Sequence, residues 1–159
     1  MLKIRDAKPL LALTVALGPW DYFVFTQDVG WALAFAWGRF VASPQGIQYL
    51  FLHDLYGLRS QFSPVAALYL WLLAGVLALL TAGFVLYARY SRGTTSRSED
   101  HQVGAAFALA GGLYLASRLV LFGGLPVGGS VYAYSIPLGA VWAMLVGAIF
   151  YFDLFRAGA

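Results

Sequence analysis

The feature that most constrains this chain is an apolar segment from Val65 to Tyr87 that contains no charged residue. The core of a bilayer is about 30 Å thick, and an α-helix needs roughly 20 apolar residues to cross it. The segment follows Ser63-Pro64, a common start of a helix, and runs into Arg89. We therefore interpret it as a transmembrane helix.

Two further segments have a similar length and hydropathy. One runs from Val103 to Phe122 and is apolar except for Arg118, and the other runs from Tyr132 to Phe152. The chain is 61% hydrophobic and 11% charged, far from the balance of soluble domains. It contains no Cys, which excludes disulfides, thiolate metal sites and a cysteine nucleophile. Lipid is expected to replace the missing polar surface.

The N-terminal third is harder to assign, because residues 9–41 are mostly apolar but are interrupted by a Gly-Pro pair and two aspartates. One straight helix of that length would measure about 50 Å, which is too long for a single span. We favour a kinked first span over residues 10–28 that continues outside the membrane as far as residue 40.

Two other interpretations of this segment stay open. In the first, residues 22–41 form the span and the preceding segment lies in the membrane interface. In the second, the segment is a secretory signal peptide, because a basic stretch precedes its apolar run. Pro19 directly follows the candidate cleavage site and argues against removal.

The sequence between the first two apolar regions is too polar to span a membrane. Within residues 44–60, apolar side chains recur at helical spacing, which predicts a short amphipathic helix in the membrane interface. Residues 89–102 are rich in Ser, Thr and charge and are expected to form a cytoplasmic loop. The predicted fold is an all-α integral membrane protein. It is a four-transmembrane-helix bundle in one domain over residues 1–159, with that interfacial helix between spans one and two.

Basic residues set the expected orientation, because Lys and Arg concentrate in cytoplasmic loops. Seven of them fall on one side of the four predicted spans: Lys3, Arg5, Lys8, Arg89, Arg92, Arg97 and Arg156. Arg39 and Arg59 fall on the other side. We expect a multi-pass protein of the cell membrane with both termini in the cytoplasm. This distribution explains the net charge of +3 better than nucleic-acid binding does, so no nucleic-acid partner is predicted.

Small residues recur every four positions in three of the spans, and such rows let membrane helices approach closely. The rows are Ala74, Ala78 and Ala82; Gly104, Ala108, Gly112 and Ala116; and Gly139, Ala143 and Gly147. They predict a compact bundle. The same faces could instead bind another membrane protein subunit or a second copy of the chain.

Three ionisable residues stand inside apolar sequence, where a charge is costly and needs a reason: Asp21, Asp28 and Arg118. Counted along the spans, all three lie in the outer half of the membrane, so a carboxylate could meet the guanidinium. We favour a structural ion pair that fixes the helix register. The alternative is a proton or anion site in an outward-facing cavity.

A second polar group, His53, Asp54, Tyr56 and Arg59, could form a pocket at the outer surface. Neighbouring residues on a helix point about 100° apart, so polar surface is the simpler interpretation of His53-Asp54. No motif for a hydrolase, a nucleotide-binding loop or a metal site is present. We predict no catalytic residues, metal or cofactor.

Three functions remain, in order of preference. The first is a small non-catalytic subunit or scaffold of a larger membrane complex. The second is a small transporter or proton-linked channel that uses the Asp21, Asp28 and Arg118 cluster. The third is an interfacial enzyme acting on a lipid or a quinone near His53.

Overall fold

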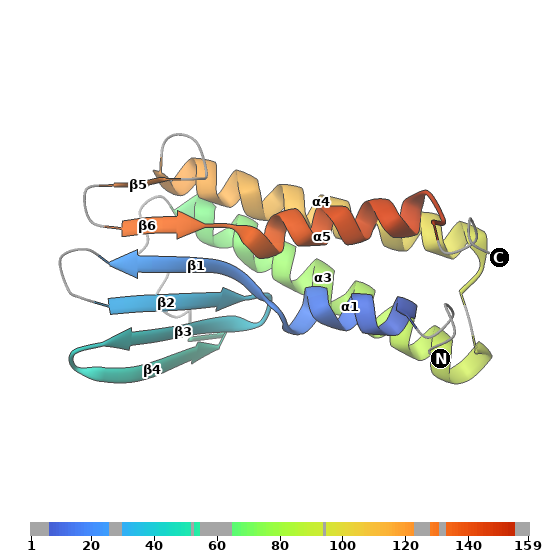
Figure 1. The fold of residues 1–159 in the computed structure, drawn as a ribbon, viewed down its shortest axis with the longest axis horizontal. Coiled ribbons are helices and arrows are strands. Elements are labelled where there is room, and N and C mark those ends of the chain that lie inside the picture. The colour runs from blue at the N-terminus through green and yellow to red at the C-terminus, as the bar shows by residue number, and fades with distance from the viewer. Residues whose placement is uncertain are drawn as a thin grey trace.

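The computed structural model describes residues 7–25, 30–51, 53–54, 65–93, 95–122, 128–130 and 133–154. Its principal helices are α1 (Ala7–Leu17), α3 (Val65–Arg92), α4 (Arg97–Phe122) and α5 (Leu138–Tyr151). Figure 1 shows an elongated molecule in which α3 and α4 run along most of the length, with the strands beside them at one end and α1 and α5 toward the other, helical end. The beginning of α1, the end of α3 and the beginning of α4 all lie at the helical end. We call this the inner end, and the strands mark the outer end.

Six antiparallel strands form one sheet in the order β4-β3-β2-β1-β6-β5. Their bounds are Pro19–Phe25 for β1, Gly30–Phe35 for β2, Gly38–Ser43 for β3, Gly46–Phe51 for β4, Gly128–Ser130 for β5 and Ala133–Ile136 for β6. The first four strands follow one another as a meander. Strand β6 then joins β1 from the far end of the sequence, with Tyr22 opposite Ile136.

The prediction of an all-α, four-span bundle is therefore wrong. Four of the strands lie in the region that we assigned to a kinked first span and an interfacial helix. Aromatic and β-branched residues dominate β1, and β2 contains two aromatic residues, Trp31 and Phe35; these residue types fit a pleated sheet. Glycines open β2, β3 and β4 at a spacing of eight residues, as turns in a meander require. One of them, Gly46, has a φ of 125°, which side chains rarely tolerate.

The individual boundaries change accordingly. In the first predicted span, residues 10–28, α1 ends at Leu17 and strand β1 follows from Pro19, while residues 26–28 lie outside the described part. The interfacial helix predicted for residues 44–60 begins as strand β4, and residues 55–60 lie outside the described part. The last predicted span, residues 132–152, is divided between β6 and α5.

The apolar segments that begin at Val65 and Val103 do form helices, and both helices extend into the predicted loop 89–102. By length and composition, α3 and α4 can cross a membrane. The 11 residues of α1 and the 14 of α5 measure about 16 and 21 Å, less than the bilayer core. The described part thus has two helices of spanning length, and strands β1 and β6 continue the lines of α1 and α5 (Figure 1).

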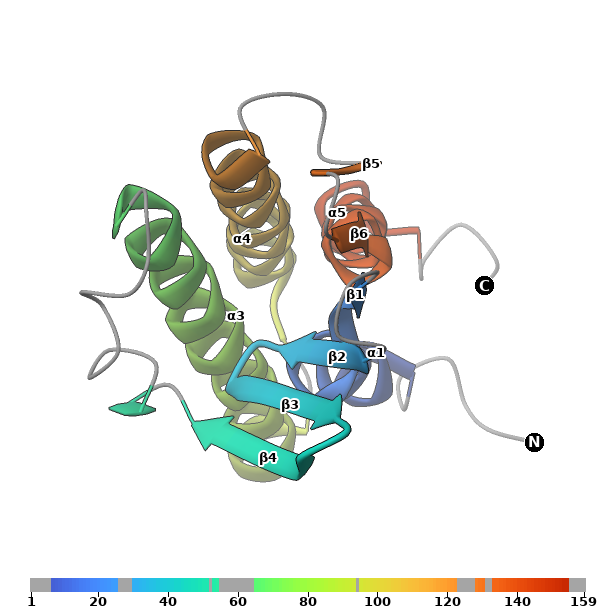
Figure 2. The same cartoon turned by 90° about the vertical axis from the view of Figure 1, so that its left-hand side faces the viewer.

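The two faces of the sheet differ in chemistry. The face toward α3 and α4 carries small and polar buried residues, among them Asp21, Ala32, Ala34 and Ser135. Figure 2 shows these two helices on one side of strands β1 to β4. The opposite face, which we call the aromatic face, consists of large apolar side chains that are half-buried or exposed. They are Tyr22, Trp31, Leu33, Phe35, Phe40, Tyr49, Phe51 and Ile136.

Small residues bring the helices together, although not in every predicted register. A Cβ atom on Gly104 would lie 2.6 Å from the carbonyl oxygen of Gly147, so α4 and α5 touch backbone to backbone there. Toward the outer end the contact passes through Gly111, whereas the predicted Gly112 has nothing within 4 Å of such an atom. The other predicted positions are either buried or half-buried: Ala74, Ala78, Ala82, Ala108, Ala116, Gly139 and Ala143.

Candidate functional site

One group of buried charges lies where the sheet joins α4. In the register of the sheet, Asp21 on β1 is opposite Ala34 on β2, and Ala34 is opposite Arg39 on β3. Residues directly across neighbouring strands point to the same face, so both charged side chains face α3 and α4. The methyl side chain of Ala34 leaves room between them for the longer arginine.

The carboxylate of Asp21 is held by groups from two other elements. Arg118 on α4 places its Nε 2.9 Å from Oδ2, and both side chains are almost completely buried. Tyr114, one turn earlier on α4, donates its hydroxyl to the same oxygen at 3.1 Å. The Ser135 hydroxyl on β6 donates to the carboxylate and lies 2.8 Å from each of its oxygens. The site therefore ties β1, β6 and α4 together.

Two arginines share one aromatic ring in this site. The guanidinium carbon of Arg118 lies 4.3 Å from the ring centre of Phe23, and that of Arg39 lies 4.5 Å from it. Both distances fit a cation–π contact. Beside the ring is a cavity of about 30 Å³, lined by Phe23, Arg39, Ala67, Leu68, Trp71, Tyr114, Ser117, Arg118 and Leu121.

The carboxylate of Asp21 has lost its hydration inside the protein. The charge of Arg118 and the hydroxyls of Ser135 and Tyr114 take the place of water around it. The cluster thus has the chemistry of a desolvated carboxylate that its neighbours hold in place. A role as an open proton relay would need water at the carboxylate, which is 1% exposed.

The structure brings Asp21 and Arg118 of the predicted cluster into direct contact, whereas Asp28 lies outside the described residues. Sequence reasoning missed Arg39, which we counted only as an outer basic residue. It also missed Tyr114 and Ser135. Tyr114 lies four positions before Arg118, a helical spacing that was available as a signal. Arg39 and Ser135 are brought in by the pairing of strands, and no local pattern marks them.

The second predicted polar group does not form a pocket in the part that is described. The side chain of His53 is 78% exposed, and its Nε2 lies 3.1 Å from Asp54 Oδ1. Asp54 also accepts a hydrogen bond from the backbone N–H of Phe51. The other two members, Tyr56 and Arg59, lie outside the described residues.

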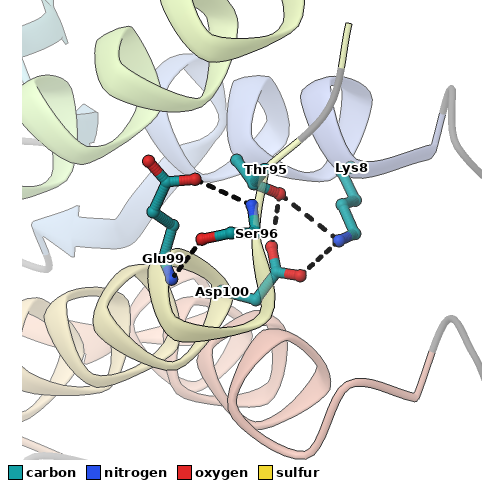
Figure 3. A network of polar contacts seen from close by, with 5 residues as sticks. All are labelled: Lys8, Thr95, Ser96, Glu99 and Asp100. Carbon is teal, nitrogen blue, oxygen red and sulfur yellow. Dashed lines mark hydrogen bonds and ion pairs between the residues drawn. The ribbon is translucent and has the colours of Figure 1, made fainter. Parts of the chain in front are cut away.

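A separate polar network lies at the inner end, at the connection between α3 and α4 (Figure 3). Lys8 of α1 forms an ion pair with Asp100 and donates a hydrogen bond to Thr95. Ser96 and Glu99 accept from each other's backbone N–H groups, the reciprocal arrangement of a capping box. These contacts start α4 and attach α1 to it.

In the described ranges, no group of three or more His, Cys, Asp or Glu is placed so that it could hold a metal ion. Comparison with known proteins does not assign the chain to a class. No protein-family model matches this sequence, and no curated protein matches it.

Proposed function

We propose that the chain is a multi-pass integral membrane protein that serves as a non-catalytic subunit or scaffold of a larger membrane complex. The apolar surface of the helices supports the membrane location. No charged residue occurs from Val65 to Ala88, from Val103 to Ser117 or from Leu138 to Phe152. Large apolar side chains are also exposed on all four of these helices, including Leu17, Tyr69, Leu80, Leu109 and Leu145. An exposed apolar surface of this extent is suited to lipid.

The basic residues support an orientation with the inner end in the cytoplasm. Lys8, Arg89, Arg92 and Arg97 stand at the beginning of α1, the end of α3 and the beginning of α4. These element ends lie together at one end of the molecule (Figure 1). Basic residues beside spans favour the cytoplasmic side. The sheet would then lie at the opposite membrane surface.

The position of the sheet favours a protein over lipid as its neighbour. The turn between β2 and β3 packs on α3 at Gly75, where a Cβ atom would lie within van der Waals overlap of Ala36. Gly75 is about 15 Å from the outer end of α3, so one end of the sheet reaches membrane depth. Hydrocarbon cannot satisfy the backbone groups of a sheet edge. A partner subunit at this level can supply hydrogen bonds as well as apolar contacts.

We propose that the partner subunit docks on the aromatic face of the sheet. Its rings form a continuous group across three strands: Trp31 stacks on Phe40, Phe40 contacts Tyr49, and Tyr49 contacts Phe51. Aromatic residues are enriched at the centres of protein interfaces, where they bury much area at a low entropic cost. The occupant that we propose is an apolar surface of another membrane subunit at the level of the outer leaflet.

A photoreactive phenylalanine analogue at Trp31 tests this proposal in native membranes, with the same analogue at Leu80 as a matched control. We expect Trp31 to cross-link one protein of defined mass that co-purifies at constant stoichiometry, and Leu80 to cross-link lipid. The substitution Trp31→Glu should release that protein while the chain keeps its helical content. Cross-links to lipid alone, or to a second copy of the chain, would overturn the proposal.

Transport through the buried cluster is the second candidate, and the contacts of Asp21 weigh against it. The carboxylate already contacts an arginine and two hydroxyls. The adjoining cavity of about 30 Å³ has room for about one water molecule, and this is not a continuous path. We therefore rank transport below the subunit role. The interfacial enzyme ranks third, because His53 stands exposed rather than in a pocket.

A further inference from the structure

We propose that the edge of strand β4 binds an extended segment of the partner subunit, which joins the sheet as one more strand. The inference rests on the proposed subunit role and deepens it, because it names the form in which the partner binds. Three observations support it: the position of β4 in the sheet, the direction of its backbone hydrogen-bonding groups and the side chains at its edge.

Strand β4 stands at one end of the sheet. Among the strands that the structure describes, it pairs with β3 alone, and β5 stands at the opposite end. Figure 2 shows β4 as the outermost strand of the meander. Proteins protect a sheet edge by keeping the edge strand short or by placing charged residues or proline in it. Strand β5 has three residues, whereas β4 has six and contains neither a charge nor a proline. The edge of β4 is therefore suited to pairing.

The backbone of β4 directs hydrogen-bonding groups away from the sheet at alternate residues. In an antiparallel pair, residues that bond to the neighbouring strand alternate with residues whose N–H and C=O groups point away from it. The N–H of Phe51 donates to Asp54 Oδ2 at 2.9 Å, so Phe51 is a residue of the second kind. The alternation assigns Tyr49 and Ile47 to the same kind. Each of these two residues directs one donor and one acceptor toward an added strand.

The side chains at the edge define what kind of segment fits. Ile47 is opposite Ala42, which is opposite Trp31, so Ile47 lies on the aromatic face together with Tyr49. Ile47 is 69% exposed. Apolar residues of an added strand would pack on Ile47 and Tyr49, since directly opposite side chains contact each other. Gln48 lies on the other face and is exposed, which favours a polar residue between the apolar ones.

A second copy of the chain does not fit this edge in a membrane. Strand β4 runs lengthwise in the molecule, as α3 and α4 do (Figure 1). The twofold axis of two identical antiparallel strands is perpendicular to those strands. Rotation about it would put the inner end of one copy beside the outer end of the other. Two copies inserted in the same orientation cannot meet in this way, so the segment comes from a different chain.

Amide hydrogen exchange, resolved to single residues, tests the inference without altering the protein. It is measured on the native complex in mild detergent and on the chain purified alone. We expect the amides of Ile47 and Tyr49 to exchange about tenfold or more slowly in the complex, because the added strand accepts hydrogen bonds from them. The amide of Gln48 points to β3 and is the internal reference, which should change far less.

A proline at the edge tests the same hydrogen bonds by substitution. Ile47→Pro removes an N–H that points away from β3, and proline is tolerated at such positions of edge strands. The preceding Gly46 has no Cβ atom to clash with the ring. We expect the amount of co-purifying partner to fall by about tenfold or more, with unchanged helical content. Ile47→Val keeps the N–H and should retain the partner.

Two results would overturn the inference. The first is equal exchange of the Ile47 and Tyr49 amides in the complex and in the isolated chain, whether fast or slow in both. The second is a folded Ile47→Pro variant that retains the partner in full. If Trp31 still cross-links the partner in either case, the subunit role stands and only the added strand is excluded. If no protein co-purifies and Trp31 cross-links lipid alone, the subunit role fails as well.

Discussion

At the scale of single residues, Asp21 concentrates more long-range interactions than any local pattern suggests. Its hydrogen-bond partners Tyr114 and Ser135 are 93 and 114 positions away in the sequence. The ion pair with Arg118 is buried on both sides. Losing one partner of a buried pair leaves the other charge desolvated, which costs more than the pair itself contributes.

We expect Asp21→Asn to lower the free energy of unfolding by about 3 kcal/mol, because Arg118 stays buried without its carboxylate. Denaturant titration in micelles measures this loss. Asp54→Asn is the matched control, since the Asp54 side chain is 39% exposed and its removal should change stability little. Equal midpoints for the two variants would contradict the structural role of the pair.

The meeting of Asp21 and Arg118 could be anticipated from the sequence by counting depth along apolar segments, because charges buried in apolar surroundings seek partners. The element that carries Asp21 could not be anticipated in this way. Asp21 would lie far from the inner end whether its segment were a helix or a strand, so its predicted depth does not distinguish the two. Arg39 belongs to the site because of the register of β1, β2 and β3, and this register cannot be predicted from the sequence of any one of these strands.

At the scale of elements, the strands of the sheet were not predicted from the sequence because both faces of the sheet carry apolar residues. A strand with one polar face alternates visibly, whereas β2 reads as Gly-Trp-Ala-Leu-Ala-Phe, apolar throughout. The small residues pack inward on the helices, and the large rings point outward. Segments like α3 are predictable, since length and hydropathy alone define them. The glycines that open β2, β3 and β4 at regular spacing were the signal for strands, which mean hydropathy does not reveal.

The interface between α4 and α5 gives a prediction with an internal control. Gly104→Ala should destabilise the protein by about 1–3 kcal/mol, because its Cβ atom would meet the backbone of Gly147 and Tyr151. Gly112→Ala should be neutral or stabilising, because that Cβ atom meets nothing within 4 Å and alanine favours helices. Thermal unfolding of both variants decides, and a destabilised Gly112→Ala would contradict the register described above.

The network at the inner end predicts local rather than global change. Lys8→Ala removes the link from α1 to Asp100 and Thr95 and leaves the buried Asp100 without its cation. We expect amide hydrogen exchange in α1 to accelerate by about tenfold or more, while the outer halves of α3 and α4 keep their protection. Arg97→Ala, at an exposed position nearby, is the control. Uniform acceleration along the chain would show instead that the network supports the whole fold.

At the scale of the whole molecule, the absence of cysteine makes the orientation directly testable. Ser98→Cys places a thiol at the exposed inner end, and Gln45→Cys places one in the exposed turn between β3 and β4. In intact cells, an impermeant maleimide should label only Gln45→Cys. Labelling of Ser98→Cys should require a permeabilised membrane. Labelling of both positions from the same side would contradict the proposed topology.

The antiparallel pairing of β1 with both β2 and β6 has a consequence for how the protein is made. During synthesis, β1 and β2 are available together, but β6 emerges only after both long helices have been produced. Until then one edge of β1 stays open, and Asp21 lacks the hydroxyl of Ser135. The nascent chain therefore carries an unfinished sheet while translation continues. When β6 pairs with β1, the N-terminal strands are joined to a segment made after both long helices.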